Sequence, residues 1–212
     1  MNFHTPIVLL VFNRPDLTRC VLERIREIQP KQLHVVADGP RHEADQVLVQ
    51  QTQEVVESLV DWDCELSWDA SDRNLGCRKR VSSGITEAFR RFDEAIILED
   101  DCLPTRAFFR FAAGALEAYR EYPEVMHVGG FNLLGKTRPS AKVKCARLYS
   151  IWGWATWARA WKHYAVKIAE FEEKLSRRPF QDLGVFEQRL EQFYRRFYKR
   201  DVDTWDYQWS FA

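Results

Sequence analysis

Four short apolar runs, separated by stretches with helical periodicity, occupy the first half of the chain. The runs at 7–11 and 95–98 are continuously apolar, and the run at 33–37 is apolar except for His34, which is typical of strands covered on both faces. The run at 64–68 alternates apolar and polar residues, which indicates a strand nearer the sheet edge. Strands that alternate with amphipathic helices pair in parallel through right-handed crossovers. The order therefore predicts an α/β fold with a doubly wound, mostly parallel sheet and helices on both faces.

Helix signals lie between and after these runs. The first predicted helix begins at Pro15, and apolar spacing predicts two more helices over 44–59 and 81–92. Thr105 is expected to cap a fourth helix, and a strand is expected at 125–128. These elements bring the predicted strand-helix alternation to the middle of the chain.

The second half of the chain has a different pattern. It predicts a strand over 143–149 and an amphipathic helix over 186–197. We find no linker, repeat or low-complexity stretch, so we expect one domain spanning 1–212. The last residues, 208–212, look like the start of an ordered element without a stop signal, so we expect the natural sequence to continue.

Composition excludes several classes of protein. Hydrophobic residues make up 46% of the chain, enough to bury a core, so a disordered or fibrous chain is excluded. Lysine and arginine together number 31, as do aspartate and glutamate, so no overall field favours nucleic acid. No apolar run approaches the ~20 residues of a transmembrane helix, and the N-terminus lacks the pattern of a secretory signal. We therefore expect a cytoplasmic protein with no transmembrane segment.

The strongest chemical signal is Glu99-Asp100-Asp101, directly after the apolar run 95–98. Adjacent carboxylates repel one another, so a positive group should compensate them at a buried strand end. Mg²⁺ and Mn²⁺ prefer carboxylate oxygens as ligands, and substrate phosphates often fill their remaining coordination positions. The alternative, a solvated acidic loop that caps the next helix, has equal weight when the motif is taken alone. Asn13 and Asp38 also follow predicted strands, and the carboxyl ends of parallel strands face one crevice. These additional polar residues favour a binding site over a solvated acidic loop.

Two further features would extend this site toward a nucleotide. Asp38-Gly39 would place a carboxylate against a ribose or base, although Asp-Gly-Pro is also an ordinary turn. Basic residues surround Gly76, ahead of the predicted third helix, namely Arg73, Arg78, Lys79 and Arg80. They would steady a diphosphate at the helix N-terminus, or form a solvated face.

Aromatic residues mark the second half. A sugar site could be lined by four tryptophans that stack on a pyranose ring, Trp152, Trp154, Trp157 and Trp161. Tryptophans at this spacing are, however, more often core residues. Asp206 lies between Trp205 and Tyr207, and a carboxylate that these rings partly desolvate would suit a general base. Asp203 is the competing base, and an ordinary loop aspartate is the alternative for either residue.

Four segments, in order, carry a family resemblance: 6–15, 89–109, 149–157 and 205–209. With them the chain resembles nucleotide-sugar glycosyltransferases of the GT-A fold. It is most similar to inverting N-acetylglucosaminyltransferases that act on mannose-terminated N-glycan cores, and to bacterial glycosyltransferase-like (haemolytic-protein-like) relatives. The chain has Asp-Tyr-Gln at 206–208 where those relatives have paired aspartates, and it lacks their C-terminal part.

The resemblance implies a site and its cofactor. Asp101 would ligate Mn²⁺ (or Mg²⁺), and Asp206 would be the catalytic base. The residues expected to bind the nucleotide are Phe12, Asn13, Arg14, Asp38, Arg78, Glu99 and Asp100. Residues 1–104 would form the nucleotide-binding half and residues 105–212 an acceptor-side extension.

The predicted function is a metal-dependent inverting glycosyltransferase. It would move a sugar from a nucleotide-diphosphate donor, with a UDP-sugar expected, to a hydroxyl of a glycan or glycolipid acceptor. The first alternative is a sugar-phosphate nucleotidyltransferase. Such an enzyme would be expected to have a glycine-rich loop directly after the first strand, but residues 11–15 contain no glycine. The second is a non-catalytic carbohydrate-binding module that uses the tryptophans.

Overall fold

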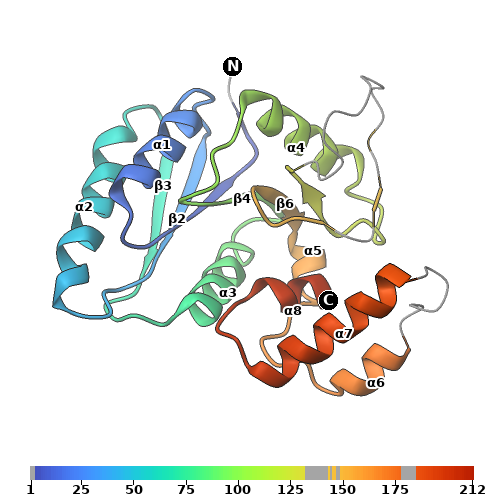
Figure 1. Ribbon diagram of the computed structural model, residues 1–212. Coiled ribbons are helices and arrows are strands. Elements are labelled where there is room, and N and C mark those ends of the chain that lie inside the picture. The colour runs from blue at the N-terminus through green and yellow to red at the C-terminus, as the bar shows by residue number, and fades with distance from the viewer. Residues whose placement is uncertain (1–2, 132–142, 144, 147–148, 178–184) are drawn as a thin grey trace.

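The computed structural model describes residues 3–131, 143, 145–146, 149–177 and 185–212. A six-stranded sheet with the order β3-β2-β1-β4-β6-β5 forms its centre (Figure 1). The strands are β1 (Ile7–Val11), β2 (Gln32–Ala37), β3 (Glu65–Ala70), β4 (Glu94–Glu99), β5 (Val128–Gly129) and β6 (Trp154–Trp157). The helices are α1 (Pro15–Arg26), α2 (Glu43–Leu59), α3 (Cys77–Ala88), α4 (Arg106–Ala118), α5 (Ala158–Trp161), α6 (Phe171–Ser176), α7 (Val185–Arg200) and α8 (Asp206–Phe211).

The pairing within the sheet confirms the predicted fold class. β1 pairs in parallel with β2 and β4, and β2 pairs in parallel with β3. β6 is antiparallel to both β4 and β5. The result is a doubly wound, mostly parallel α/β sheet. Because the parallel strands β1, β2 and β4 share one direction, their carboxyl ends meet at one edge.

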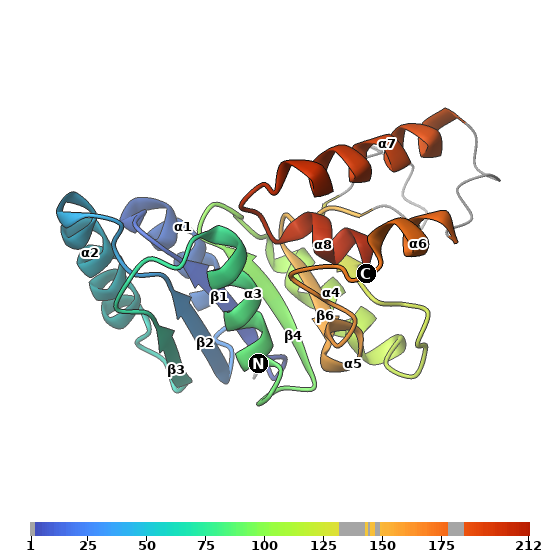
Figure 2. The same ribbon diagram turned by 90° about the horizontal axis from the view of Figure 1, so that it is seen from below.

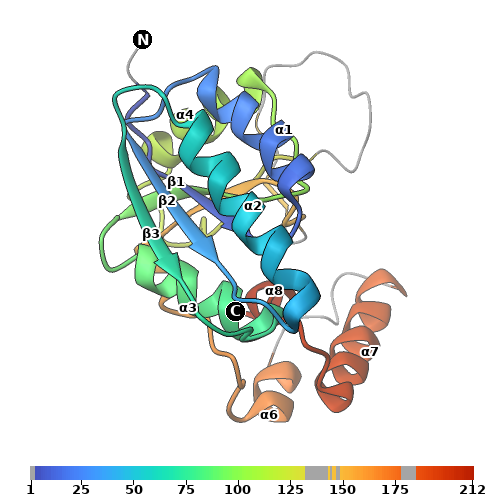
Figure 3. The same ribbon diagram turned by 90° about the vertical axis from the view of Figure 1, so that its left-hand side faces the viewer.

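Helices cover both faces of this sheet. α1, α2 and α4 contribute side chains to one core, and α3, α5 and α8 contribute to a second core on the other face. Figure 3 shows α1 and α2 side by side over one face, with α3 on the other. Every residue of β1 is buried, as expected for a strand that lies between two helical layers.

The C-terminal helices form a smaller cluster of their own. Phe171, Leu175, Tyr194 and Phe211, from α6, α7 and α8, pack together. Figure 2 shows these three helices grouped together, away from α1 and α2. α7 confirms the late amphipathic helix expected over 186–197. No helix in the described part of the chain is both long and apolar enough to cross a membrane.

Local signals account for several element ends. Pro15 starts α1, and the Thr105 hydroxyl accepts the backbone N–H of Phe108 at 3.2 Å, which confirms the predicted cap of α4. The strand expected over 125–128 is wrong in extent, because β5 covers only Val128 and Gly129. The backbone N–H of Val125 donates to the carbonyl of Tyr122 at 3.0 Å in a turn, and its carbonyl accepts the Arg159 guanidinium at 3.0 Å, so neither group is in a strand ladder. Of the strand expected over 143–149, residues 144 and 147–148 lie outside the described residues, and the described residues 143, 145, 146 and 149 are not in a strand.

Candidate active site at the carboxyl ends of the strands

The acidic motif lies at the end of β4, next to the turn that follows β1. Glu99 is half-buried, Asp100 is buried and Asp101 is exposed. The Arg14 guanidinium donates through Nη1 to Asp100 Oδ1 at 3.1 Å and to Asp101 Oδ2 at 2.8 Å. The backbone N–H of Phe12 also donates to the Asp100 carboxylate. Two predicted nucleotide-binding residues, Phe12 and Arg14, are thus brought to the acidic motif.

The acidic motif carries more negative charge than Arg14 compensates. Burial, and then the neighbouring carboxylates of Asp101, Asp100 and Asp206, raise the pKa of Glu99 to about 7. Burial raises the pKa of Asp100 to about 6, against the opposing effect of Arg14. A divalent cation would relieve this repulsion, and carboxylate oxygens are the ligands that Mn²⁺ and Mg²⁺ prefer. Among the described residues, no three His, Cys, Asp or Glu side chains are already arranged around a single metal position.

Asp38 connects the end of β2 to the loop before α3. Its Oδ1 accepts the backbone N–H groups of Gly39 and Leu75, both at 2.9 Å. Its Oδ2 accepts Asn74 Nδ2 at 3.0 Å and the backbone N–H of Gly76 at 3.2 Å. Both carboxylate oxygens therefore bond the chain itself. The contact of Asp38 with a nucleoside stays a prediction, and the structure adds a role in loop geometry.

Asn13 belongs to a polar network that sequence reasoning missed. Its Nδ2 donates to Asp45 Oδ1 at 2.7 Å, and Arg41 donates to both oxygens of Asp45 at 2.6 and 3.0 Å. Arg41 holds the pKa of Asp45 well below its usual range. The same guanidinium lies 5.1 Å from the ring centroid of Phe12. Arg41 and Asp45 are four residues apart at the start of a helix, and this spacing was the available signal.

A carboxylate from the far end of the chain binds at the N-terminus of α3. Asp203 Oδ2 accepts the backbone N–H of Cys77 and Oδ1 accepts that of Arg78, both at 3.1 Å. The Arg78 guanidinium donates to Asp201 Oδ1 at 2.5 Å. Gly76 has φ of +80°, and a Cβ there would lie 2.7 Å from Asp203 Oδ2. An internal anion therefore uses the donors that the sequence predicted for a diphosphate.

This connection brings Asp206 to the acidic motif. Asp206 begins α8, and the hydroxyl of Thr204 donates to its carboxylate. The Asp206 carboxylate is near enough to raise the pKa values of Glu99 and Cys77. The structure thus gathers carboxylates from β4 and from the end of the chain at one sheet edge.

The tryptophans divide into core and surface. Trp154, Trp157 and Trp161 are buried, so they do not form an exposed sugar floor. Trp152 is 58% exposed. The core interpretation is therefore correct for three of the four residues.

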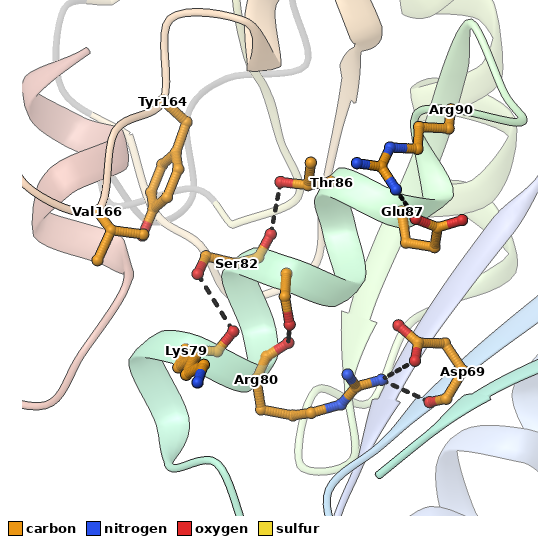
Figure 4. Close-up of a pocket in the computed structure, with 10 residues that line it drawn as sticks. Asp69, Lys79, Arg80, Ser82, Thr86, Glu87, Arg90, Tyr164 and Val166 are labelled. Carbon is orange, nitrogen blue, oxygen red and sulfur yellow. Dashed lines mark hydrogen bonds and ion pairs between the residues drawn. The ribbon is translucent and has the colours of Figure 1, made fainter.

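A separate pocket of about 560 Å³ lies beside α3 (Figure 4). Arg80, which lines it, pairs with Asp69 Oδ1 at 2.8 Å. The Thr86 hydroxyl in the same pocket donates to the carbonyl of Ser82 at 2.7 Å. These polar groups bond within the chain. Lys79 and Arg80, two of the basic residues predicted to steady a diphosphate, line the pocket, but neither the acidic motif nor Asp38 nor Asp206 does. The strand-end site is therefore the stronger candidate.

Comparisons with known proteins assign no family to the chain. No family model matches the chain, and no curated protein matches its sequence. Among solved structures, 4-diphosphocytidyl-2C-methyl-D-erythritol synthase from Anaerococcus prevotii is similar over 90% of this chain and 84% of that chain. Its sequence identity is 9% and its TM-score is 0.40. So distant a likeness carries no argument about activity.

Proposed function

We propose that the chain is a metal-dependent inverting glycosyltransferase. Its donor would be a nucleotide-diphosphate sugar, of which a UDP-sugar is the first to test, and its acceptor a hydroxyl of a glycan or glycolipid. The observation that supports this most is the contact of Asp203 with the N-terminus of α3, which brings Asp206, three residues later, to the loop that Asp38 holds at the end of β2. A metal-binding group and a proton acceptor at one crevice are the two parts that such a transfer needs.

The acidic motif would hold the metal. Asp101 is exposed and would be the direct ligand, with Glu99 and Asp100 supporting it and the ribose. Bound Mn²⁺ or Mg²⁺ would neutralise charge on the diphosphate leaving group. Because Arg14 donates to both Asp100 and Asp101, it would exchange part of this contact when the metal binds.

The nucleotide would lie along the neighbouring strand ends. Phe12 and Asn13 follow β1, and Asp38 follows β2, so these residues would contact the nucleoside. Arg78 would contact the diphosphate, for which it would exchange its present partner Asp201. With these assignments, the site extends from the end of β4 to the ends of β1 and β2.

Asp206 would accept the proton of the acceptor hydroxyl. The hydroxyl oxygen forms a bond to the anomeric carbon as the bond from that carbon to the diphosphate oxygen breaks. Attack opposite the leaving group inverts the anomeric centre, and the proton goes to the Asp206 carboxylate.

Turnover of a UDP-sugar with and without Mn²⁺ tests this proposal, with water in place of the acceptor if none is known. We expect metal-dependent release of UDP, lowered by roughly 10²-fold or more in Asp206→Asn with nucleotide binding retained. Full turnover in Asp206→Asn would contradict the assigned base. Asp203→Asn is a second arm, since Asp203 caps α3 and its loss should disturb both binding and turnover.

The same samples separate the alternatives. A nucleotidyltransferase would release pyrophosphate from a nucleoside triphosphate when a sugar phosphate is supplied. A non-catalytic carbohydrate-binding module would bind saccharides and release neither product. Either result would replace the glycosyltransferase proposal.

A further inference from the structure

Two exposed aromatic side chains touch each other near the acidic motif. Trp152 is 58% exposed and Phe131 is 49% exposed, although each of the other tryptophans is buried or half-buried. The ring centroids of the pair lie 4.9 Å apart, and the ring planes meet at 82°. Two nearly perpendicular rings form a corner with one aromatic floor and one aromatic wall.

The backbone holds Trp152 out of the core. Residues two apart in a strand normally face the same side, so Trp152 would follow Trp154 into the core. Gly153 lies between them with φ of +70°, a left-handed conformation that interrupts this alternation. The carbonyl of Gly153 accepts the backbone N–H of Gly130 at 2.8 Å, which brings the residue next to Phe131 alongside. The exposed corner is therefore fixed by the main chain.

The position of the corner relative to the sheet suggests its ligand. Ile97 of β4 pairs with Trp154 of β6, and a Cβ on Gly153 would lie 3.5 Å from Leu98 Cδ2, so the backbone next to Trp152 lies beside the residue that precedes Glu99. The nucleotide-side residues follow β1 and β2, on one side of β4, whereas β6 lies on the other side. The aromatic corner thus flanks the acidic motif on the side opposite the expected nucleoside.

We infer that Trp152 and Phe131 form a stacking platform for a pyranose ring of the acceptor saccharide. A pyranose presents an apolar face of C–H groups, which suits an exposed indole, and hydroxyl donors, which suit the nearby carboxylates. The acidic surroundings disfavour an anionic ligand at this corner. The role of this saccharide as acceptor rests on the proposed glycosyl transfer, whereas the saccharide site itself does not.

Intrinsic fluorescence offers a direct test, because Trp152 is the tryptophan most open to a quencher. The probes are methyl pyranosides of glucose, galactose, mannose and N-acetylglucosamine, added without nucleotide. We expect at least one to reduce acrylamide quenching of the wild-type protein. Calorimetry should show roughly tenfold weaker binding of that saccharide by Trp152→Ala, with Trp152→Phe recovering part of it.

Tyr122→Ala is the matched control. Tyr122 is also exposed, at 51%, and lies close to Arg120, which pairs with Glu94 at the opposite end of β4. Saccharide binding should be unchanged in this variant. Mn²⁺-dependent UDP binding should be unchanged in Trp152→Ala, since the platform does not hold the nucleotide.

Three outcomes would overturn the inference: no protection by any of the saccharides, binding that Trp152→Ala leaves intact, or protection by a UDP-sugar with Mn²⁺ alone. The last would assign the corner to the donor sugar. Saccharide protection in a protein that binds no UDP-sugar would support the platform and contradict the proposed transferase, so the two claims fail separately.

Discussion

At the scale of single residues, Asp38 shows how one carboxylate organises a loop. Both of its oxygens accept hydrogen bonds, including those from the backbone N–H groups of Leu75 and Gly76. Asp38→Ala would leave these donors without their partner, so we expect the free energy of unfolding to fall by about 2–4 kcal/mol in urea titrations. Asp38→Asn keeps one acceptor oxygen and should lose less. An alanine variant as stable as the wild type would show that the loop does not depend on this carboxylate.

His127 is a second residue with a measurable effect, this time on pH dependence. Its ring stacks on Tyr149, with centroids 4.0 Å apart, and its Nδ1 accepts Trp209 Nε1 at 3.2 Å. Burial lowers the pKa of His127 to about 3, below its ordinary value of 6.5. The unfolded chain therefore takes up this proton first, and stability that is complete above pH 6.5 is lost as the pH falls toward 3.

The loss from His127 should approach about 1.4 kcal/mol of unfolding free energy per pH unit below its unfolded pKa. Urea titrations at a series of pH values measure it. His127→Gln has no group that titrates there, so its stability should fall less steeply over the same range. Equal slopes in the two proteins would mean that His127 is not held neutral in the fold.

At the scale of elements, two helical glycines make opposite predictions. A Cβ on Gly84 of α3 would lie 2.2 Å from Val36 Cγ1 of β2, whereas a Cβ on Gly114 of α4 meets nothing within 4 Å. Gly84→Ala would push α3 off the sheet, and we expect it to lower the free energy of unfolding by roughly 3 kcal/mol. Gly114→Ala should raise it by up to about 1 kcal/mol. Thermal and urea unfolding of both variants measure these changes; similar effects would contradict the close contact of α3 with β2.

The elements also show what a sequence can and cannot predict. β1, β2 and β4 are short apolar runs and the first four helices have clear apolar periodicity, so the local pattern predicted them, although α3 spans Cys77–Ala88 and not 81–92. The extent of β5 was overestimated because Val125 donates its backbone N–H to Tyr122 in a turn and bonds Arg159, far along the chain, through its carbonyl. The Asp203 cap of α3 joins residues more than a hundred positions apart, and no local pattern encodes such a contact. Acidic residues after β4 were predictable as a group, but their link to Arg14 required the fold.

At the scale of the whole molecule, the end of the chain returns to the sheet edge at which the candidate site lies. Strands β1, β2 and β4 place Arg14, Asp38 and Glu99 at one edge of the sheet, and α8 returns Asp206 to that edge. Trp205 and Trp209 are buried in the second core, which anchors this return. The segment from 201 to 206 therefore couples the helical C-terminal cluster to the strand ends.

The proposed function requires the acidic motif to bind a nucleotide through a divalent cation. Titration calorimetry of UDP with the wild-type protein, in Mn²⁺ and then in excess chelator, measures this binding. Asp101→Asn is the key variant, and Asp63→Asn is its control, since Asp63 is likewise an exposed partner of one cation, Lys31. The account predicts that wild type and Asp63→Asn bind UDP in Mn²⁺ alone, and that Asp101→Asn binds it in neither condition while remaining folded. Equal affinity for UDP with and without metal, or unchanged affinity in Asp101→Asn, would contradict it.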